Sequence, residues 1–173
     1  MTELALNGTA ALITGGGSGI GLESARRLVA DGSAVTIMGR TEERLRGAVT
    51  ALEAAAPING LVRFVVGDAG SEDDVAAAVK VATQATGGLD FAVASAGRGG
   101  LGPIITTPLE EWTDVLRTNL TGTFLLFKHA GAAIAGTGGG SMVAISSIAA
   151  AVTHPFMGPY CVSKAGIDML VRQ

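Results

Sequence analysis

The sequence predicts an α/β fold in which a doubly wound parallel sheet forms one domain over residues 1–173. Three observations support this prediction. Short apolar runs alternate with longer amphipathic segments, an order that implies parallel strands joined by right-handed helical crossovers. The runs are almost continuously apolar, as expected of strands that helices cover on both faces. Neither a linker nor an internal repeat divides the chain, so we expect a single domain.

The five short apolar runs are the predicted strands. They are residues 10–13, 35–38, 62–66, 91–94 and 142–145. Their lengths and their apolar character are typical of buried strands. Residues 136–140 are rich in glycine, and we expect them to form the loop that leads into the fifth strand.

Two of the predicted helices carry start signals. Thr41 can cap a helix, and two glutamates follow it in the electropositive first turn. The apolar side chains that then share one helix face are Leu45, Val49 and Leu52. Ser71 and Asp74 resemble a capping box, with Asp in place of the usual Glu. We therefore expect helices to begin after Thr41 and after Ser71.

The composition excludes several classes of protein. The chain is 48% hydrophobic and 16% charged, which is typical of a globular protein and not of a disordered one. A net charge of −3 provides no electrostatic footprint for nucleic acid or for an anionic membrane. The single cysteine, Cys161, cannot form an internal disulfide, and residues 1–8 have no basic region before an apolar stretch. We therefore expect no signal peptide and a cytoplasmic protein.

One long stretch lacks charge altogether. Residues 129–163 contain no Asp, Glu, Lys or Arg, which raises the alternative of a membrane span. The glycine-rich loop and two prolines interrupt this stretch, and no apolar run in it approaches the ~20 residues that a spanning helix needs. A buried strand together with the wall of a binding site is the better interpretation.

A glycine-rich turn follows the first predicted strand and opens a helix. Residues 14–21 read Thr-Gly-Gly-Gly-Ser-Gly-Ile-Gly. Glycines let the backbone turn tightly and let a pyrophosphate approach free N–H groups at the positive end of a helix. The spacing departs from the commoner Gly-x-Gly-x-x-Gly, and a merely flexible turn is the alternative. The position after a buried strand favours dinucleotide binding by Gly15, Ser18, Gly19, Ile20 and Gly21.

Tyr160 and Lys164 lie four residues apart, so on a helix they project from the same face. A free tyrosine is a poor base near neutrality, but a nearby ammonium favours the phenolate and so suits general acid–base chemistry. Ser147 follows the fifth predicted strand and so lies at the carboxyl ends of the parallel strands, where open α/β sheets bind ligands. By itself the Tyr–Lys spacing also fits a core tyrosine beside a solvated lysine.

Together these motifs resemble one family along the whole chain. The glycine-rich turn, Asn119 within Asn-Leu-Thr-Gly, Ser147, and Tyr-Cys-Val-Ser-Lys at 160–164 follow the order and spacing of the short-chain dehydrogenase/reductase family. The resemblance implies a Rossmann-type fold and hydride transfer between NAD(P)(H) and a small hydroxyl or carbonyl substrate. It implies that Tyr160 is the general acid/base and that Ser147 hydrogen-bonds the substrate oxygen. It further implies that Lys164 favours the ionised tyrosine and holds the nicotinamide ribose beside Tyr160, and that Asn119 supports a proton-relaying water.

The resemblance also assigns other residues to the cofactor. Asp68, at the end of the third strand, is expected to contact the adenine ring, with Ala69 next to it. A turn-forming Asp68 is the alternative. Ser95, Ala96 and Gly97 follow the fourth strand, where the family usually has Asn-Asn-Ala-Gly and this chain has Ala-Ser-Ala-Gly. The missing asparagines put the rigidity of this turn in question.

The end of the second strand bears on the choice of cofactor. NAD-preferring relatives have an acidic residue there, which accepts hydrogen bonds from the ribose 2′-OH. This chain has Gly39 followed by Arg40, and a guanidinium can bind a 2′-phosphate through two hydrogen bonds. Against this, Ser18 stands where many NADP-using relatives have Arg or Lys, and Arg40 could instead pair with Glu42 or Glu43. The charges favour NADP over NAD.

The remaining expectations concern the substrate and the whole protein. Residues 98–103 and 148–157 are expected to line the substrate pocket, with His154 as a wall or surface residue, and no metal ligand is predicted. The family continues through two more strands, and without them the fifth strand would be a bare apolar edge. We expect a homo-oligomer, and either a longer natural product or a short form that associates and turns over poorly. A weak or inactive dinucleotide-binding sensor or scaffold, and isomerase or dehydratase chemistry on the same scaffold, are the alternatives.

Overall fold

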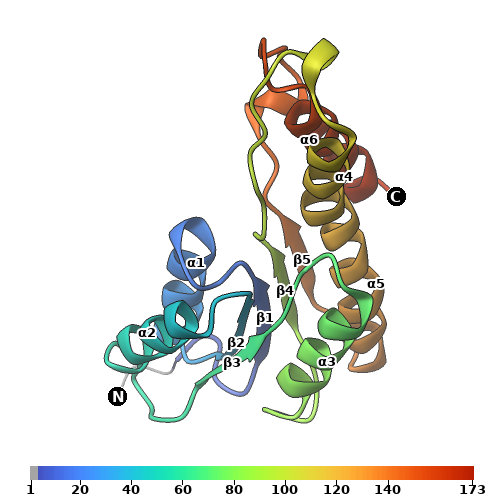
Figure 1. Ribbon diagram of the computed structural model, residues 1–173. Coiled ribbons are helices and arrows are strands. Elements are labelled where there is room, and N and C mark those ends of the chain that lie inside the picture. Colours follow the sequence, from blue (N-terminus) through green and yellow to red (C-terminus); the bar gives the residue numbers. More distant parts are fainter. Residues whose placement is uncertain (1–3) are drawn as a thin grey trace.

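The computed structural model describes residues 4–173 and has a five-stranded parallel sheet at its centre (Figure 1). Residues 1–3, part of the segment in which no signal peptide is expected, lie outside the described range. The strand order is β3-β2-β1-β4-β5, so the chain winds outward in both directions from β1. The bounds are β1 (Ala10–Thr14), β2 (Ala34–Gly39), β3 (Val62–Val66), β4 (Phe91–Ala94) and β5 (Ser141–Ala144). The predicted doubly wound fold is confirmed, and every predicted strand is found within one residue of its expected bounds.

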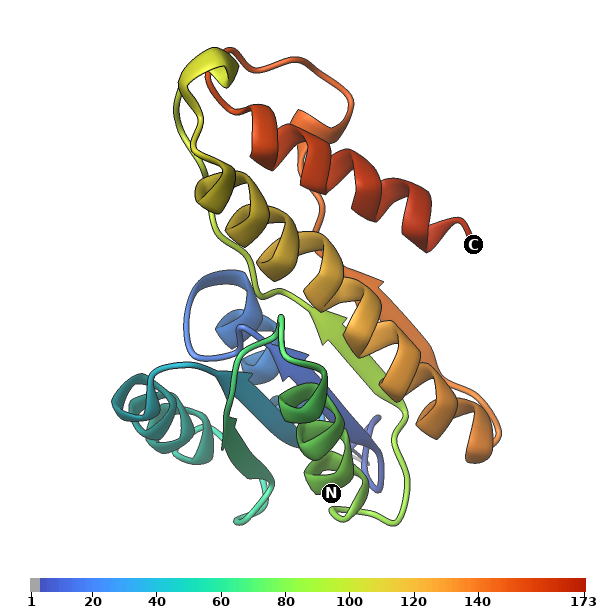
Figure 2. The same ribbon diagram turned by 45° about the vertical axis from the view of Figure 1, so that its right-hand side comes forward.

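Helices cover both faces of the sheet (Figures 1 and 2). On one face α1 (Gly19–Ala30) and α2 (Glu42–Glu53) bury a core with β1, β2 and β3. On the other face α3 (Glu72–Thr83) and α5 (Gly122–Gly136) bury a second core against β1, β2 and β4. Because both faces are covered, the inner strands are apolar throughout: all five residues of β1 are buried.

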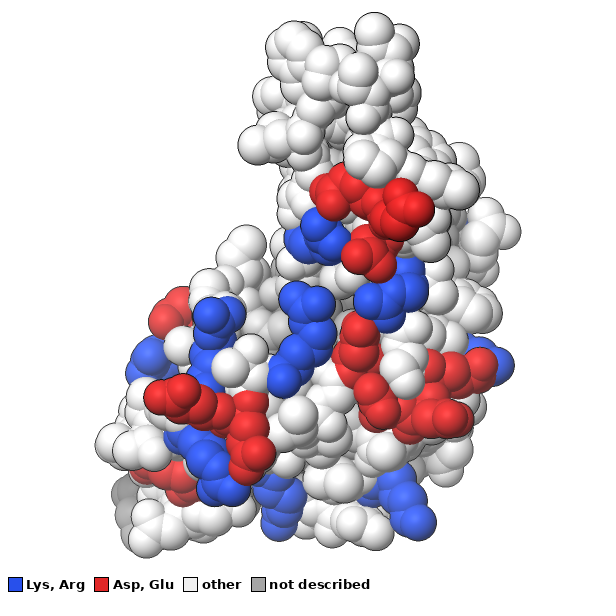
Figure 3. Space-filling model, in the orientation of Figure 1, with Lys and Arg blue, Asp and Glu red and all other residues white. Residues whose placement is uncertain are grey.

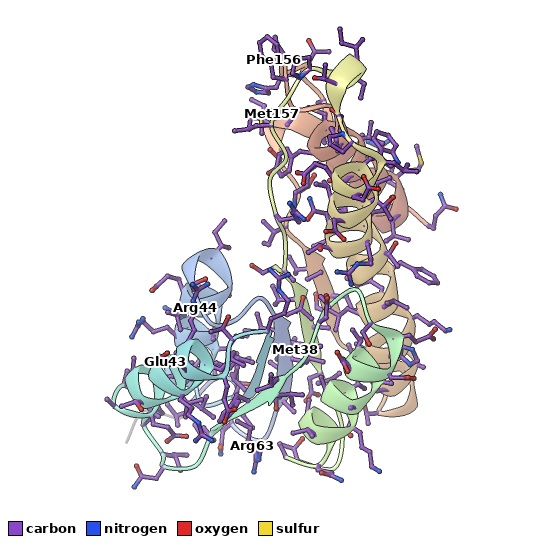
Figure 4. All side chains as sticks on the ribbon, viewed as in Figure 1. Met38, Glu43, Arg44, Arg63, Phe156 and Met157 are labelled. Carbon is purple, nitrogen blue, oxygen red and sulfur yellow. The ribbon has the colours of Figure 1, made fainter. Side chains whose placement is uncertain are left out.

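A second group of elements extends beyond the carboxyl ends of the strands. It contains the short turn η1 (Ile104–Thr106), α4 (Leu109–Leu116), the π-helical turn η2 (Arg117–Thr121), the short turn η3 (Ile148–Ala150) and α6 (Gly158–Val171). The α6 helix packs against α4 and η2 (Figure 2). The predicted pocket loops meet there, because the N–H of Gly102 donates to the carbonyl of Phe156 at 2.8 Å. Phe156 and Met157 lie at the tip of this extension (Figure 4).

The predicted start signals are only partly realised. The Ser71 hydroxyl accepts a hydrogen bond from the N–H of Asp74, at 3.4 Å, as a cap should. The Asp74 carboxylate does not complete the capping box but accepts from the N–H of Asp68 at 2.9 Å. Thr41 precedes α2 as predicted, although its side chain makes no capping bond. Of the two predicted start signals, only Ser71 therefore caps its helix with its side chain.

The charge-free stretch 129–163 contains the end of α5, strand β5, the loop with η3 and the start of α6. Among residues 4–173, no helix combines the length and the apolarity that crossing a bilayer requires. Strand β5 forms one edge of the sheet, and Met142 and Val143 on it are 38% and 49% exposed. The expected apolar edge is therefore present in this chain.

Candidate functional site

A cleft of about 350 Å³ opens at the carboxyl ends of the strands, where β1 lies between β2 and β4. Parallel sheets bind ligands at this point because the connections leave in opposite directions and separate. The cleft gathers residues from the turns after β1, β2, β3 and β4. The predicted cofactor residues that line it are Gly15, Ser18, Gly19, Ile20, Arg40, Asp68, Ala69, Ser95, Ala96 and Gly97.

Other lining residues were not predicted. Met38 and Leu45 also fit core positions of a strand and a helix, and Thr118 lies in a π-helical turn without a sequence signal. The further residues are Gly39, Thr41, Arg44, Gly67 and Ile145. Among them Arg44 carries a charge that could have drawn attention, since it lies four residues after Arg40. Met38 lies near the end of β2, at the centre of the sheet (Figure 4).

The glycine-rich turn packs too closely to accept side chains. Gly15 has a φ of +71°, and a Cβ on it would lie 2.7 Å from the backbone nitrogen of Ala96. A Cβ on Gly21 would lie 2.5 Å from the carbonyl oxygen of Gly15. Gly21 is buried and does not line the cleft, so what the structure shows for it is close packing of α1 against the turn. Its predicted contact with the cofactor stays a prediction.

The start of α1 is suited to an anion. Ser18 precedes the helix with an extended backbone and makes no side-chain capping bond. Within residues 4–173, the N–H groups of Gly19, Ile20 and Gly21 have no acceptor, as is usual for the first turn of a helix. A Cβ on Gly19 would meet nothing within 4 Å, so the backbone there is open to the cleft. Free N–H groups and the helix dipole favour a phosphate at this position.

The turn after β4 is braced in spite of its missing asparagines. The N–H of Ser95 donates to the carbonyl of Thr14 at 3.2 Å, and the N–H of Ala96 lies 3.5 Å from the Thr14 hydroxyl. Thr14 is only 2% exposed. The buried threonine therefore holds the turn that the departure from the family pattern put in question.

Asp68 lines the cleft, but its carboxylate is engaged by the protein. One oxygen accepts from the N–H of Gly70 and the other from Arg117, both at 2.9 Å. Burial raises the pKa of Asp68, but the Gly70 hydrogen bond and the Arg117 guanidinium outweigh it and hold that pKa below its usual range. This geometry agrees with the alternative of a turn-forming aspartate. Arg117 was not predicted because its partner is far away in the sequence.

Arg40 forms an ion pair with neither Glu42 nor Glu43, which was the alternative to its binding a 2′-phosphate. Glu42 instead pairs with Arg46 at 2.6 Å, and within residues 4–173 Glu43 pairs with no cation. Figure 3 shows positive side chains along the notch that divides this face of the molecule. The charged residues that line the cleft are Arg40, Arg44 and Asp68.

The predicted Tyr–Lys pair lies on α6, next to the end of the cleft. The ammonium of Lys164 donates to the carbonyl of Ile145 at 2.6 Å and lies 5.6 Å from the centre of the Tyr160 ring. Burial lowers the pKa of Lys164, and the charge of Asp168 opposes this shift. Within residues 4–173 the Tyr160 hydroxyl has no hydrogen-bond partner. The phenol is therefore free to bond a ligand.

Asn119 ties three segments of the site together. Its amide oxygen accepts from the N–H of Arg98 at 2.8 Å, and its amide nitrogen donates to the carbonyl of Arg98 and to the hydroxyl of Ser163, both at 3.0 Å. The Ser163 hydroxyl in turn donates to the carbonyl of Tyr160 at 2.7 Å. Asn119 and Ser163 are fully buried. Both amide N–H groups of Asn119 are thus used by the protein, and its predicted support of a water stays a prediction.

The last predicted catalytic residue is Ser147, and all four of these residues can now be placed relative to the cleft. The Ser147 side chain caps η3 by accepting from the N–H of Ala149 at 3.2 Å. Asn119, Ser147, Tyr160 and Lys164 do not line the cleft itself. Asn119 and Lys164 adjoin it, because a Cβ on Gly97 would lie 3.4 Å from the amide oxygen of Asn119 and 3.9 Å from the ammonium of Lys164. Tyr160 lies one turn before Lys164 on α6, and Ser147 follows the lining residue Ile145 by two positions. A ligand that reaches Gly97 would therefore lie close to Asn119 and Lys164.

Comparisons with known proteins agree with this arrangement. A sequence profile of short chain dehydrogenases matches residues 9–173. "Dehydrogenase/reductase SDR family member 4" of Bos taurus is 35% identical over 169 residues, which are 96% of this chain and 59% of that protein. The structure of NAD⁺-bound xylitol dehydrogenase has a TM-score of 0.89 at 30% identity, over 95% of this chain and 63% of that one. A variant of actinorhodin polyketide ketoreductase with NADPH has a TM-score of 0.87 at 33% identity, over 94% and 62%.

These relatives are longer than the chain, which spans about six tenths of their length. Within that span the match covers the sheet, the cleft and the helix that carries Tyr160 and Lys164. Fold, motif order and profile agree, and the chain belongs to the short-chain dehydrogenase/reductase family.

Proposed function

We propose that the protein is an NAD(P)-dependent oxidoreductase that interconverts a hydroxyl and a carbonyl group. The observation that carries this proposal is the contact between the cleft and Lys164. Gly97 and Ile145 line the cleft, and the ammonium of Lys164 bonds the carbonyl of Ile145 and lies beside Gly97. Tyr160 lies one turn earlier on the same helix. A dinucleotide in the cleft would thus present its reactive end to an acid/base group.

The residues of the cleft fit such a cofactor. The free N–H groups at the start of α1 would hold the pyrophosphate, and Asp68 and Ala69 would lie at the adenine end. Lys164 would hold the nicotinamide ribose. A bound nicotinamide ring would supply or take up the hydride.

The chemistry of the protein's own groups then concerns one proton. In the reducing direction the Tyr160 hydroxyl donates its proton to the carbonyl oxygen, while the Ser147 hydroxyl hydrogen-bonds the same oxygen. The phenolate that remains is stabilised by the charge of Lys164, whose ammonium lies 5.6 Å from the ring centre. In the oxidising direction the same phenolate takes the proton from the hydroxyl. Asn119 acts through Ser163 on the helix that carries Tyr160.

The preferred cofactor in this proposal is NADP. Arg40 lines the cleft at the end of β2, where no carboxylate stands to repel a 2′-phosphate. Its guanidinium is not engaged by Glu42, which pairs with Arg46. The charge of Arg40 helps to lower the pKa of Asp68, but within residues 4–173 Arg40 forms no ion pair, so its guanidinium can bond the more negative cofactor.

The substrate in this proposal is apolar and uncharged. The loops 98–103 and 148–157, which meet at Gly102 and Phe156, expose Leu101, Ile148, Val152 and Phe156. The one cation of these loops, Arg98, is neutralised by Glu111 at 2.8 Å and by Asp114 at 3.1 Å. His154 is exposed. Such loops offer a charged substrate no partner.

The experiment is a turnover assay on the full-length protein. It follows the absorbance of NADPH or NADH in the presence of apolar ketones, polar ketones and 2-oxo acids, and of NADP⁺ or NAD⁺ with the matching alcohols. We expect turnover of apolar ketones, faster with NADPH. A preference for 2-oxo acids would contradict the proposed substrate class alone. No turnover of either cofactor in either direction would contradict the proposed function.

A further inference from the structure

Two arginines without ion-pair partners stand on the same side of the cleft. Arg40 follows β2, and Arg44 lies in the first turn of α2; both line the cleft and are exposed. Among residues 4–173, neither guanidinium lies within ion-pair distance of a carboxylate. Two cations are therefore available to a ligand at this position.

Within the described part of the chain, Arg44 forms no ion pair, although α1 and α2 carry several carboxylates. Three carboxylates on or next to these helices pair with other arginines, in Glu23–Arg26, Asp31–Arg27 and Glu42–Arg46, and Glu53 accepts from the N–H groups of Gly60 and Val62. Glu43 adjoins Arg44 in the sequence, but the two side chains diverge: Figure 4 places Arg44 between α1 and α2, and Glu43 lower on α2. The Arg44 side chain therefore points to the cleft and away from Glu43.

Packing sets this direction. The Cγ and Cδ atoms of Arg44 lie 3.5 and 3.7 Å from the point where Gly17 would carry a Cβ. The aliphatic part of the arginine thus lies along the glycine-rich turn, in space that a side chain at position 17 would enter. A stem held in this way presents its guanidinium at a lower cost in conformational entropy than a freely rotating one.

The charges of the cleft leave a positive surplus beside α2. Among residues 4–173, Asp68 is the only acid that lines it; Arg117 pairs with Asp68 at 2.9 Å, and the charge of Arg40 also lowers its pKa. The glycine-rich turn contributes Ser18 and no cation of its own. A phosphate monoester carries about two negative charges at neutral pH, which two guanidinium groups match.

We propose that Arg44 is a second specificity-determining residue, which binds the 2′-phosphate of the dinucleotide together with Arg40. This inference rests on the proposed function and adds a residue to its cofactor preference. In the proposed function the free N–H groups at the start of α1 bind the pyrophosphate, which both cofactors have. Arg44 would bind only the 2′-phosphate and would therefore discriminate between NADP and NAD. Removing its guanidinium should weaken NADP binding and leave NAD binding nearly unchanged.

The test measures dissociation constants for NADP⁺ and NAD⁺ by titration calorimetry on the full-length protein. Adenosine 2′,5′-bisphosphate and AMP serve as fragments that differ only by the 2′-phosphate. For Arg44→Ala we expect NADP⁺ and the bisphosphate to bind about 10- to 100-fold more weakly, the range for one charged hydrogen-bonding group. NAD⁺ and AMP should bind within about 2-fold of the original protein, since they lack that phosphate. Arg44→Lys keeps the charge but not the planar fork, so its affinity for NADP⁺ should lie between that of the original protein and that of Arg44→Ala.

Arg46→Ala is the matched control. Arg46 lies on the same helix, pairs with Glu42 and does not line the cleft. Its removal should therefore leave unchanged the ratio of the affinity for NADP⁺ to the affinity for NAD⁺. Arg40→Ala should lower the ratio, and the double variant Arg40→Ala/Arg44→Ala should bring it close to one. Because the interaction is between charges, added salt should reduce the preference of the original protein.

The outcomes separate this inference from the proposed function. If the original protein binds neither dinucleotide, both are wrong. If it binds NAD⁺ as tightly as NADP⁺, the cofactor preference and the role of Arg44 are wrong, while the oxidoreductase proposal stands. If it prefers NADP⁺ and Arg44→Ala keeps the ratio, or weakens both dinucleotides equally, the role of Arg44 alone is overturned.

Discussion

Lys164 holds its amino group in a buried position, 5% exposed, between the carbonyl of Ile145 and the ring of Tyr160. Burial lowers the pKa of Lys164 because it disfavours the charged form, and the carboxylate of Asp168 acts in the opposite direction. If the ammonium is needed for turnover, activity is lost as the pH rises through this lowered pKa. The alkaline limit of activity should thus lie below the pH at which an exposed lysine titrates.

Asp168→Asn tests the electrostatic origin of that limit. The substitution removes the charge that raises the pKa of Lys164, so the pKa falls further and the alkaline limb of the kcat profile should move to lower pH. The measurement is kcat against pH for both proteins in the proposed reaction. Asp73→Asn, in the first turn of α3, controls for the loss of one negative charge and should leave the limb in place. A limb that stays unchanged, or moves to higher pH, in Asp168→Asn contradicts the assignment.

At the scale of elements, the geometry of the candidate site depends on the hydrogen bonds between η2 and α6. The π-helical turn directs the amide of Asn119 both to the backbone of Arg98 and to Ser163, and Ser163 reaches the carbonyl of Tyr160. Three segments that are distant in the sequence are thereby fixed to one another by buried hydrogen bonds. Such bonds are costly to break because their partners stay buried.

Ser163→Ala should break this tie with little change in volume. An amide N–H of Asn119 would lose its acceptor, so we expect the free energy of unfolding to fall by about 1–3 kcal/mol. We also expect a lower kcat with a smaller effect on cofactor affinity, because the helix that carries Tyr160 loses a fixed position. Denaturant unfolding and steady-state kinetics measure the two effects.

Ser24→Ala provides the comparison for this prediction. Ser24 also donates to a carbonyl of its own helix, that of Ile20 at 2.8 Å, but bonds no other segment. Its replacement should cost less than about 0.5 kcal/mol, as for an ordinary surface position. Equal losses in the two variants would show that Ser163 has only a local role.

Features that depend on the local sequence could be predicted, whereas long-range contacts could not. The strands were predictable because burial on both faces makes each run apolar, and the glycine-rich turn because Gly15 must adopt a positive φ beside Ala96. The Asp68–Arg117 pair and the bonds of Arg98 with Glu111 and Asn119 join residues that only the tertiary fold brings together. No local pattern carries that information.

At the scale of the whole molecule, the sheet has two open edges, which are formed by β5 and β3. Strand β5 exposes Met142 and Val143, and β3 exposes Val66 at the opposite edge to a similar extent, 47% against 49% for Val143. An apolar edge invites pairing with further chain. The chain spans 59% of its bovine relative, and we expect additional strands to cover β5 in the natural protein. The expected homo-oligomer and cytoplasmic location stay predictions.

Two lysine substitutions in the full-length protein compare the edges. If β5 is covered there, Val143→Lys buries a charge and should lower the free energy of unfolding by more than about 2 kcal/mol. Val66→Lys should cost less than about 1 kcal/mol if β3 remains an open edge. Denaturant titrations give both values. Equal, small losses would show that β5 remains open.

The central claim is that Tyr160 exchanges a proton with the substrate at the end of a dinucleotide cleft. The most direct measurement is kcat for Tyr160→Phe in the full-length protein, together with the dissociation constant for NADPH. We predict that kcat falls by about 10²-fold or more, the usual contribution of a positioned acid/base group, while NADPH binds within about 3-fold of the original affinity. Turnover near the original rate would contradict the account, because the phenol would then be dispensable.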